Sequence, residues 1–253
     1  MSTPITDTAT YRADAGRIAA VAAGHLDAEV PACPGWAVRD LLVHLGSVHR
    51  WAGEVLRTGE SPGRMPGEGG ADPAPDDDGR LLDWFTGGAL ELADALDAMD
   101  PGAPSWLPWV LERPVAGVWL RRMTQETSVH RWDAESAVGE PGPIAAPLAA
   151  DGVDEYFTLI VPRRVARDGI DLPSGSLHVH CTDDDLEGVN GEWFVTAADG
   201  YAVTPEHRKG DAVLRGRAED LLLALWGRPV PEGGVEVVGD PEIAAAWLAV
   251  GGS

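Results

Sequence analysis

A chain of 253 residues with 44% hydrophobic and 24% charged residues is long enough for one large globular domain or two smaller ones. Acidic residues outnumber basic ones by 41 to 19, and the formal net charge of -22 disfavours binding to nucleic acid or to an anionic membrane surface. No apolar run approaches the roughly 20 residues that span a membrane, and the first ten residues do not resemble a secretory signal. We therefore expect a cytoplasmic protein.

Four segments of the first half carry apolar residues at helical intervals, and glycines or prolines end each one. The predicted helices cover about residues 6–26, 37–57, 80–99 and 115–138. Four such helices predict a bundle. Residues 59–79 contain Gly, Pro and Asp too densely for a regular element, which predicts an exposed, mobile connection. Whether this connection closes over a site is left open.

The second half has a different pattern, in which helical segments alternate with period-two stretches. We expect helices over 147–167, 218–227 and 241–250, and strands over 176–182, 192–198, 212–217 and 235–239. This pattern predicts an α+β domain that is smaller than the helical one. The breaker-rich sequence GEPGPIAAP, residues 139–147, indicates the boundary, so the expected domains are 1–142 and 143–253.

Polar groups interrupt the apolar faces of the second and fourth predicted helices. On a helical wheel His44 shares a face with apolar residues such as Leu41, whereas His49 points well away and is expected at the solvent or at a domain interface. Glu126 and His130, four residues apart, share one face of the fourth helix. Two imidazoles and one carboxylate are a known ligand set for a catalytic divalent ion, with zinc the first candidate. A hydrogen-bonded core cluster is the alternative interpretation.

The two cysteines lie far apart and lack the spacing of a metal knuckle, so we expect ordinary reduced thiols. Cys33, in the sequence PACPGW, could serve as a nucleophile only with a partner base. No feature of the sequence marks such a base, and a packed small residue is the favoured interpretation.

Two stretches of the helical half resemble a known family. VPACPGWAVRDLLVHLGSVHRWA, residues 30–52, and ETSVHRWDAESAVG, residues 126–139, are similar to segments of the actinobacterial mycothiol-dependent maleylpyruvate isomerases. The N-terminal domain of that family is a DinB-like four-helix-bundle metalloenzyme domain. The resemblance maps the family's metal-binding positions onto His44, Glu126 and His130, the residues that the helical wheels select.

The second half resembles the same family through RGRAEDLLLALWGRPV, residues 215–230. The resemblance implies a C-terminal domain related to sterol-carrier folds that helps to receive the thiol cofactor, mycothiol. Arg217, Arg228 and Arg131 are candidates for anchoring the polar groups of this cofactor, and structural arginines are the alternative for each. Asp133, close to His130, is expected to orient a ligand or to support the helix.

The resemblance implies an enzyme in which a divalent ion, with zinc the first candidate, activates the thiol of mycothiol for addition to an electrophilic small molecule. Addition, rotation about the resulting single bond and elimination would convert a cis double bond to trans. The first alternative is a mycothiol S-transferase in detoxification or natural-product biosynthesis. The second is a non-catalytic metal- or ligand-binding module. The family also suggests a monomer.

Overall fold

The computed structural model describes residues 5–70, 72–109 and 111–250. These residues form two compact units, one built from residues 5–107 and 111–143, the other from residues 144–250 together with 108–109. The domain limits expected from the sequence, 1–142 and 143–253, stay a prediction. Over the described ranges, no helix combines the length and apolar character needed to cross a membrane.

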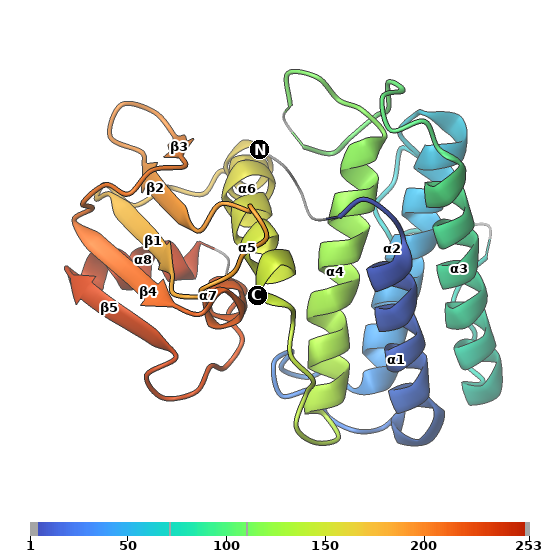
Figure 1. Cartoon of the computed structure of the whole chain (residues 1–253). Helices are drawn as coiled ribbons and strands as arrows, with labels where there is room; N and C mark the ends of the chain where they lie inside the picture. Colours follow the sequence, from blue (N-terminus) through green and yellow to red (C-terminus); the bar gives the residue numbers. More distant parts are fainter. Residues whose placement is uncertain (1–4, 71, 110, 251–253) are drawn as a thin grey trace. The chain divides into compact units, whose positions relative to one another are not determined.

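The first unit is a bundle of four helices, as the sequence predicts (Figure 1). Its helices are α1 (Ala9–His25), α2 (Val38–Thr58), α3 (Asp78–Ala98) and α4 (Gly117–Ser136). Gly59 ends α2 in the left-handed conformation, with φ of 73°, and its N–H donates to the Val55 carbonyl. The Asp77 carboxylate begins α3 by accepting a hydrogen bond from the N–H of Arg80.

The core of the bundle contains aliphatic side chains of α2 together with residues of α1 and α3. Leu41, Leu42 and Leu45 are fully buried. Each such side chain contributes roughly 1.5–3 kcal/mol by leaving water. Because these residues and His44 belong to the same helix, the packing that buries them also fixes the direction of the His44 side chain.

The second unit begins with α5 (Ala146–Glu155), a π-helical turn η1 (Tyr156–Ile160) and α6 (Val161–Asp168), where the sequence predicts one continuous helix. Pro162 has no N–H to donate, and the chain widens at this point. The N–H of Val161 donates to the Tyr156 carbonyl, so the Phe157 carbonyl needs another donor. The Tyr201 hydroxyl supplies it at 2.6 Å.

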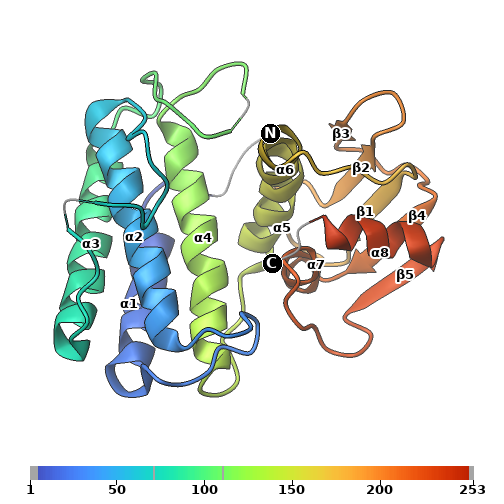
Figure 2. The same ribbon diagram turned by 180° about the vertical axis from the view of Figure 1, so that it is seen from behind.

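The described part of this unit also contains a five-stranded mixed sheet in the order β3-β2-β1-β4-β5. The strands are β1 (Leu177–Cys181), β2 (Glu192–Thr196), β3 (Ala202–Thr204), β4 (Ala212–Gly216) and β5 (Val235–Gly239). Helices α7 (Ala218–Leu225) and α8 (Pro241–Ala249) lie against one face of the sheet, as the two opposite views show (Figure 1 and Figure 2). The short edge strand β3 is absent from the sequence prediction.

Candidate metal centre

The three residues selected from the sequence lie together inside the helical unit. His44 comes from α2, and Glu126 and His130 come from adjacent turns of α4. The Glu126 Oε1 atom is 3.3 Å from His44 Nε2 and 3.5 Å from His130 Nε2. The two imidazole rings meet edge to face, with centroids 5.1 Å apart. One ligand atom from each residue lies within 4.8 Å of the other two.

Asp133 fixes the orientation of the His130 ring. Its Oδ2 atom is 2.9 Å from His130 Nδ1, and the carboxylate is fully buried. Burial lowers the pKa of His130, but the hydrogen bonds to Asp133 and Glu126 outweigh it and raise this pKa to about 9. With Nδ1 held by Asp133, Nε2 is the ring nitrogen that faces Glu126, which is the usual arrangement of a metal-binding histidine and its carboxylate partner.

Arg122 holds the other oxygen of the Glu126 carboxylate. It precedes Glu126 by one helical turn and forms an ion pair with Oε2, leaving Oε1 directed at the two imidazoles. Burial acts to raise the pKa of Glu126, but the charge of Arg122 and the hydrogen bonds from His130 and His44 hold it well below its ordinary value. Glu126 is therefore a carboxylate at neutral pH. The spacing of four residues between Arg122 and Glu126 is a signal in the sequence that could have identified this ion pair.

The burial of the two α2 histidines differs from the expectation. The His44 side chain is 37% exposed and lies beside the Trp36 ring, with centroids 5.2 Å apart. His49, expected at the solvent or at a domain interface, is 0% exposed. It lies between the rings of Tyr11 and Phe85, and burial lowers its pKa to about 3. That expectation was wrong because α2 contacts α1, α3 and α4, so its buried face is wider than a single apolar stripe.

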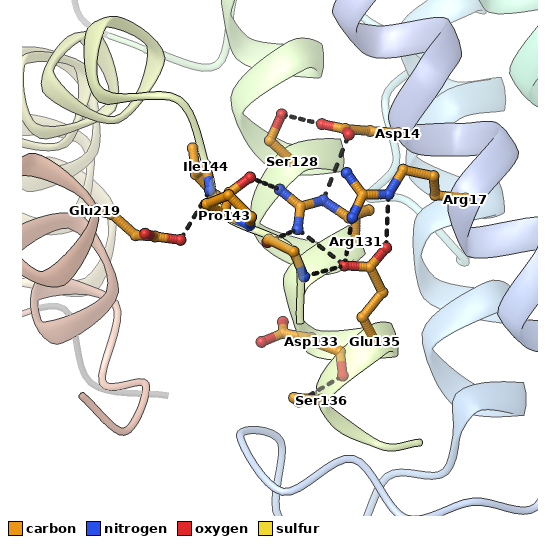
Figure 3. Close-up of polar contacts among 11 residues, drawn as sticks. Asp14, Arg17, Ser128, Arg131, Asp133, Glu135, Ser136, Pro143, Ile144 and Glu219 are labelled. Atoms are coloured by element: carbon orange, nitrogen blue, oxygen red, sulfur yellow. Dashed lines mark hydrogen bonds and ion pairs between the residues drawn. The ribbon is translucent and has the colours of Figure 1, made fainter. Parts of the chain in front are cut away.

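Arg131, a candidate anchor for mycothiol, is fully buried and binds groups within the helical unit (Figure 3). Its guanidinium pairs with Glu135 at 3.0 Å, lies 3.4 Å from Asp14, and donates to the carbonyls of Gly142 and Pro143. These contacts hold the chain that leaves α4. They give Arg131 a structural role, and a contact with mycothiol stays a prediction.

The other two candidate anchors lie in the second unit. Arg217 is exposed at the start of α7 and is 3.4 Å from the Glu219 carboxylate. Arg228 follows α7 and donates to the Trp226 carbonyl at 2.8 Å. The proposed role of these two side chains in binding mycothiol also stays a prediction.

Cys33 lies closer to the metal centre than its sequence context indicates. Its Sγ atom is 3.8 Å from the Asp133 Oδ2 atom, which in turn holds His130. Both cysteines are free thiols. The PACPGW turn therefore positions a thiol beside the carboxylate that supports the site, a proximity that cannot be read from residues 100 positions apart in sequence.

The connection after α2 covers a cavity of about 840 Å³ beside α2 and α3. The cavity is lined by Arg50, Trp51 and Glu54 of α2 and by Arg64 and Asp72 of the connection. None of His44, Glu126 and His130 lines it. Two tryptophans hold the connection in place, because Trp51 donates to the Arg64 carbonyl at 2.9 Å and Trp84 donates to the Asp72 carbonyl at 3.1 Å.

Comparison with known proteins identifies both units. Residues 9–135 match the mycothiol maleylpyruvate isomerase N-terminal domain, and residues 147–246 match the C-terminal domain of the same family. Two crystal structures of the mycothiol-dependent maleylpyruvate isomerase, one of them of a mutant, align with TM-scores of 0.55 and 0.56. Each covers 94% of this chain and 95% of the other chain at 12% identity, so this likeness concerns the fold. No curated protein matches the sequence.

Proposed function

Because the chain belongs to the mycothiol maleylpyruvate isomerase family, we propose that it is a divalent-metal enzyme that uses mycothiol to isomerise a small electrophilic molecule. The observation that carries the proposal is the convergence of His44 Nε2 and His130 Nε2 on one oxygen of Glu126. Such a group of two neutral donors and one anionic donor fits a zinc-class ion and leaves a coordination position for a thiol.

The residues present fit this ion chemically. Glu126 is ionised and directs Oε1 at both imidazoles, while Arg122 occupies Oε2. His130 turns Nε2 toward the same point because Asp133 holds Nδ1. A divalent ion held there would lower the pKa of a bound thiol and supply it as a thiolate at neutral pH.

Each side chain then has a separate task. His44 and His130 would bind an ion through neutral nitrogens, so His130, whose pKa is raised to about 9, would release a proton on becoming a ligand. Asp133 keeps the ring in the required tautomer. Arg122 balances the charge of Glu126, which lies in a largely buried position.

The isomerisation itself needs a nucleophile that adds to the double bond and leaves again after rotation. The thiol of mycothiol supplies that nucleophile in the proposal, and Cys33 is not required. The same centre would also serve transfer of the thiol to an electrophile. A mycothiol S-transferase is thus the alternative within the same chemistry, and turnover of the thiol distinguishes the two reactions because the isomerase regenerates it.

The test compares wild type with His44→Ala. His44 is more than a third exposed, so its loss removes a ligand without opening a cavity in the core. His25→Ala, at the exposed end of α1, is the matched control. Zinc content, isomerisation of maleylpyruvate with and without mycothiol, and the amount of free thiol remaining are measured for all three proteins.

We expect wild type and His25→Ala to isomerise the substrate only with mycothiol and without consuming it, and His44→Ala to lose at least about 100-fold in rate. Net consumption of the thiol would mean that the protein is a mycothiol S-transferase and not an isomerase. If His44→Ala binds as much zinc as wild type and is equally active, the proposed centre is wrong.

A further inference from the structure

A second group of metal-ligating side chains lies in the C-terminal unit, apart from the centre described above. It contains His178, His180, Glu192 and His207, and one ligand atom from each lies within 4.8 Å of the others. His178 and His180 are two residues apart on β1, so both point to the same face of the sheet. Glu192 is directly opposite His180 on the antiparallel neighbour β2. The strand register therefore fixes three of the four side chains on one face.

These three side chains lie on the face of the sheet that points away from α7 and α8. Leu177 and Val179, which alternate with the two histidines along β1, are fully buried. They pair in register with the buried Ala212 and Leu214 of β4. Alternation along the strand directs His178 and His180 to the opposite face. Cys181 shares the side of Leu177 and Val179, so its thiol is not a member of the group.

His207 reaches the group because of the strand order. The chain leaves the edge strand β3 and enters β4 on the far side of β1, so residues 205–211 must cross β2 and β1. Two contacts hold this crossing segment. The Arg208 guanidinium lies 4.3 Å from the centre of the Phe194 ring, and the Asp211 carboxylate accepts hydrogen bonds from the N–H and the hydroxyl of Ser176 at 2.9 and 2.7 Å.

The four groups converge through specific atoms. His180 Nδ1 and His207 Nδ1 are 2.5 and 3.0 Å from Glu192 Oε1, and His178 Nε2 contacts Oε2. The ring centroids of His178 and His207 are 4.9 Å apart, and each is within 5.9 Å of the His180 ring. Three ring nitrogens thus surround one carboxylate. His178 is buried, whereas the His207 side chain is 74% exposed. An ion could therefore enter the group from the solvent on the side of His207.

The electrostatics of the group suit a cation. Burial acts to raise the pKa of Glu192, but hydrogen bonds from His207, His178 and His180 outweigh it and lower this pKa. The carboxylate is therefore ionised at neutral pH. Arg215 of β4 pairs with His180 in the strand register. Its guanidinium forms an ion pair with the Glu236 carboxylate at 3.2 Å.

We propose that His178, His180, Glu192 and His207 form a second metal site, which binds one zinc ion through three imidazole nitrogens and one carboxylate oxygen. Four protein ligands fill a tetrahedral shell, so this site is closed and structural, in contrast to a three-ligand catalytic centre. The bound ion would fasten the crossing segment to β1 and β2. This assignment does not depend on the proposed isomerase activity.

The test uses the full chain carrying His44→Ala and His130→Ala, which removes the first centre. Zinc is stripped with a chelator and titrated back against a chromophoric zinc indicator, and the melting temperature is recorded with and without zinc. His207→Ala and Glu192→Gln are then added separately. His207 is a surface side chain, so its loss should leave the fold intact, and His25→Ala is the surface-histidine control.

We expect about one zinc ion per chain in the double variant, a higher melting temperature with zinc, and affinity about 100-fold weaker after His207→Ala or Glu192→Gln. His25→Ala should change neither value. Should the double variant fail to fold, His207→Ala in the wild-type chain must lower the zinc stoichiometry by one. The proposal is overturned if the double variant binds no zinc, or if neither His207→Ala nor Glu192→Gln weakens its zinc affinity, in which case the group is a hydrogen-bonded cluster only.

Discussion

Asp133 is the residue on which the geometry of the candidate metal centre depends most. It carries no proposed ligand atom, yet its Oδ2 atom contacts both His130 Nδ1 and Cys33 Sγ. Its side chain is fully buried, so the charge interacts with its partners with little screening from water. Removing that charge should act on the metal through His130 rather than through lost packing.

We expect Asp133→Asn to weaken zinc binding at this centre by about 10- to 100-fold, because the amide cannot hold His130 in its metal-binding tautomer as strongly. The affinity is measured by competition with a chelator, counting only the zinc that His44→Ala removes. Asp14→Asn is the control, since Asp14 is also a buried carboxylate but accepts a hydrogen bond from Ser128 away from the centre. Equal zinc affinity in wild type and Asp133→Asn would limit Asp133 to a role in packing.

The residues of the first centre could be predicted from the sequence, whereas those of the second could not. His44, Glu126 and His130 follow from helical spacing and from two sequence stretches that resemble the family. His207 joins His178 only because β3 is an edge strand and the chain must cross two others, and this order is not encoded in local periodicity. The wheel also misplaced His49, because periodicity locates the centre of an apolar face better than its width.

Among the elements, α2 and α3 pack closely at Gly46 of α2. A Cβ atom built on Gly46 would lie 2.3 Å from Cζ3 of Trp84. The Trp84 ring has little freedom to move, since its Nε1 donates to the Asp72 carbonyl and the Arg50 guanidinium stacks on it at 3.9 Å. Gly53, in the same helix, has no atom within 4 Å of such a Cβ.

Gly46→Ala should therefore lower the free energy of unfolding by about 1–3 kcal/mol through overpacking. Gly53→Ala should raise it by up to about 1 kcal/mol, because alanine restricts the unfolded chain and favours helix. Urea unfolding of the two variants gives both values. A stabilised Gly46→Ala protein would mean that Trp84 can rotate away without loss.

The long helices of the bundle could be predicted from the sequence, whereas strand β3 and the π-helical turn could not. Both results have a physical reason. Each bundle helix repeats its apolar pattern over several turns, so the signal accumulates along the segment. Strand β3 has three residues, too few to show alternation. The π turn at Tyr156–Ile160 depends on Pro162 and on the distant Tyr201 hydroxyl, and a window of local sequence contains only the first of these.

At the scale of the whole molecule, two electrostatic effects oppose each other as the pH falls. The excess acidic side chains, which give a net charge of -22, repel one another, and protonation of ordinary carboxylates relieves this repulsion. Other carboxylates have a lowered pKa in the fold: Asp97 through hydrogen bonds from Arg12 and Thr8, and Asp211 through those from Ser176. Glu135 belongs to the same class, because the Gly142 N–H, Arg131 and Arg17 outweigh the effect of burial on its pKa.

A carboxylate whose folded pKa is depressed stabilises the protein above its unfolded pKa, and this contribution is lost as the pH falls through the folded value. At about 0.15 M salt, charges more than about 8 Å apart are screened, so the loss should dominate and the free energy of unfolding should fall below about pH 4.5. Glu135→Gln should lower the free energy of unfolding by about 1–3 kcal/mol at pH 7 and by progressively less in acid. Glu140→Gln, at an exposed position, should have the same free energy of unfolding as wild type at each pH. Urea unfolding between pH 7 and pH 3 measures these curves. If wild type gains stability on acidification even at this salt concentration, self-repulsion outweighs the paired carboxylates.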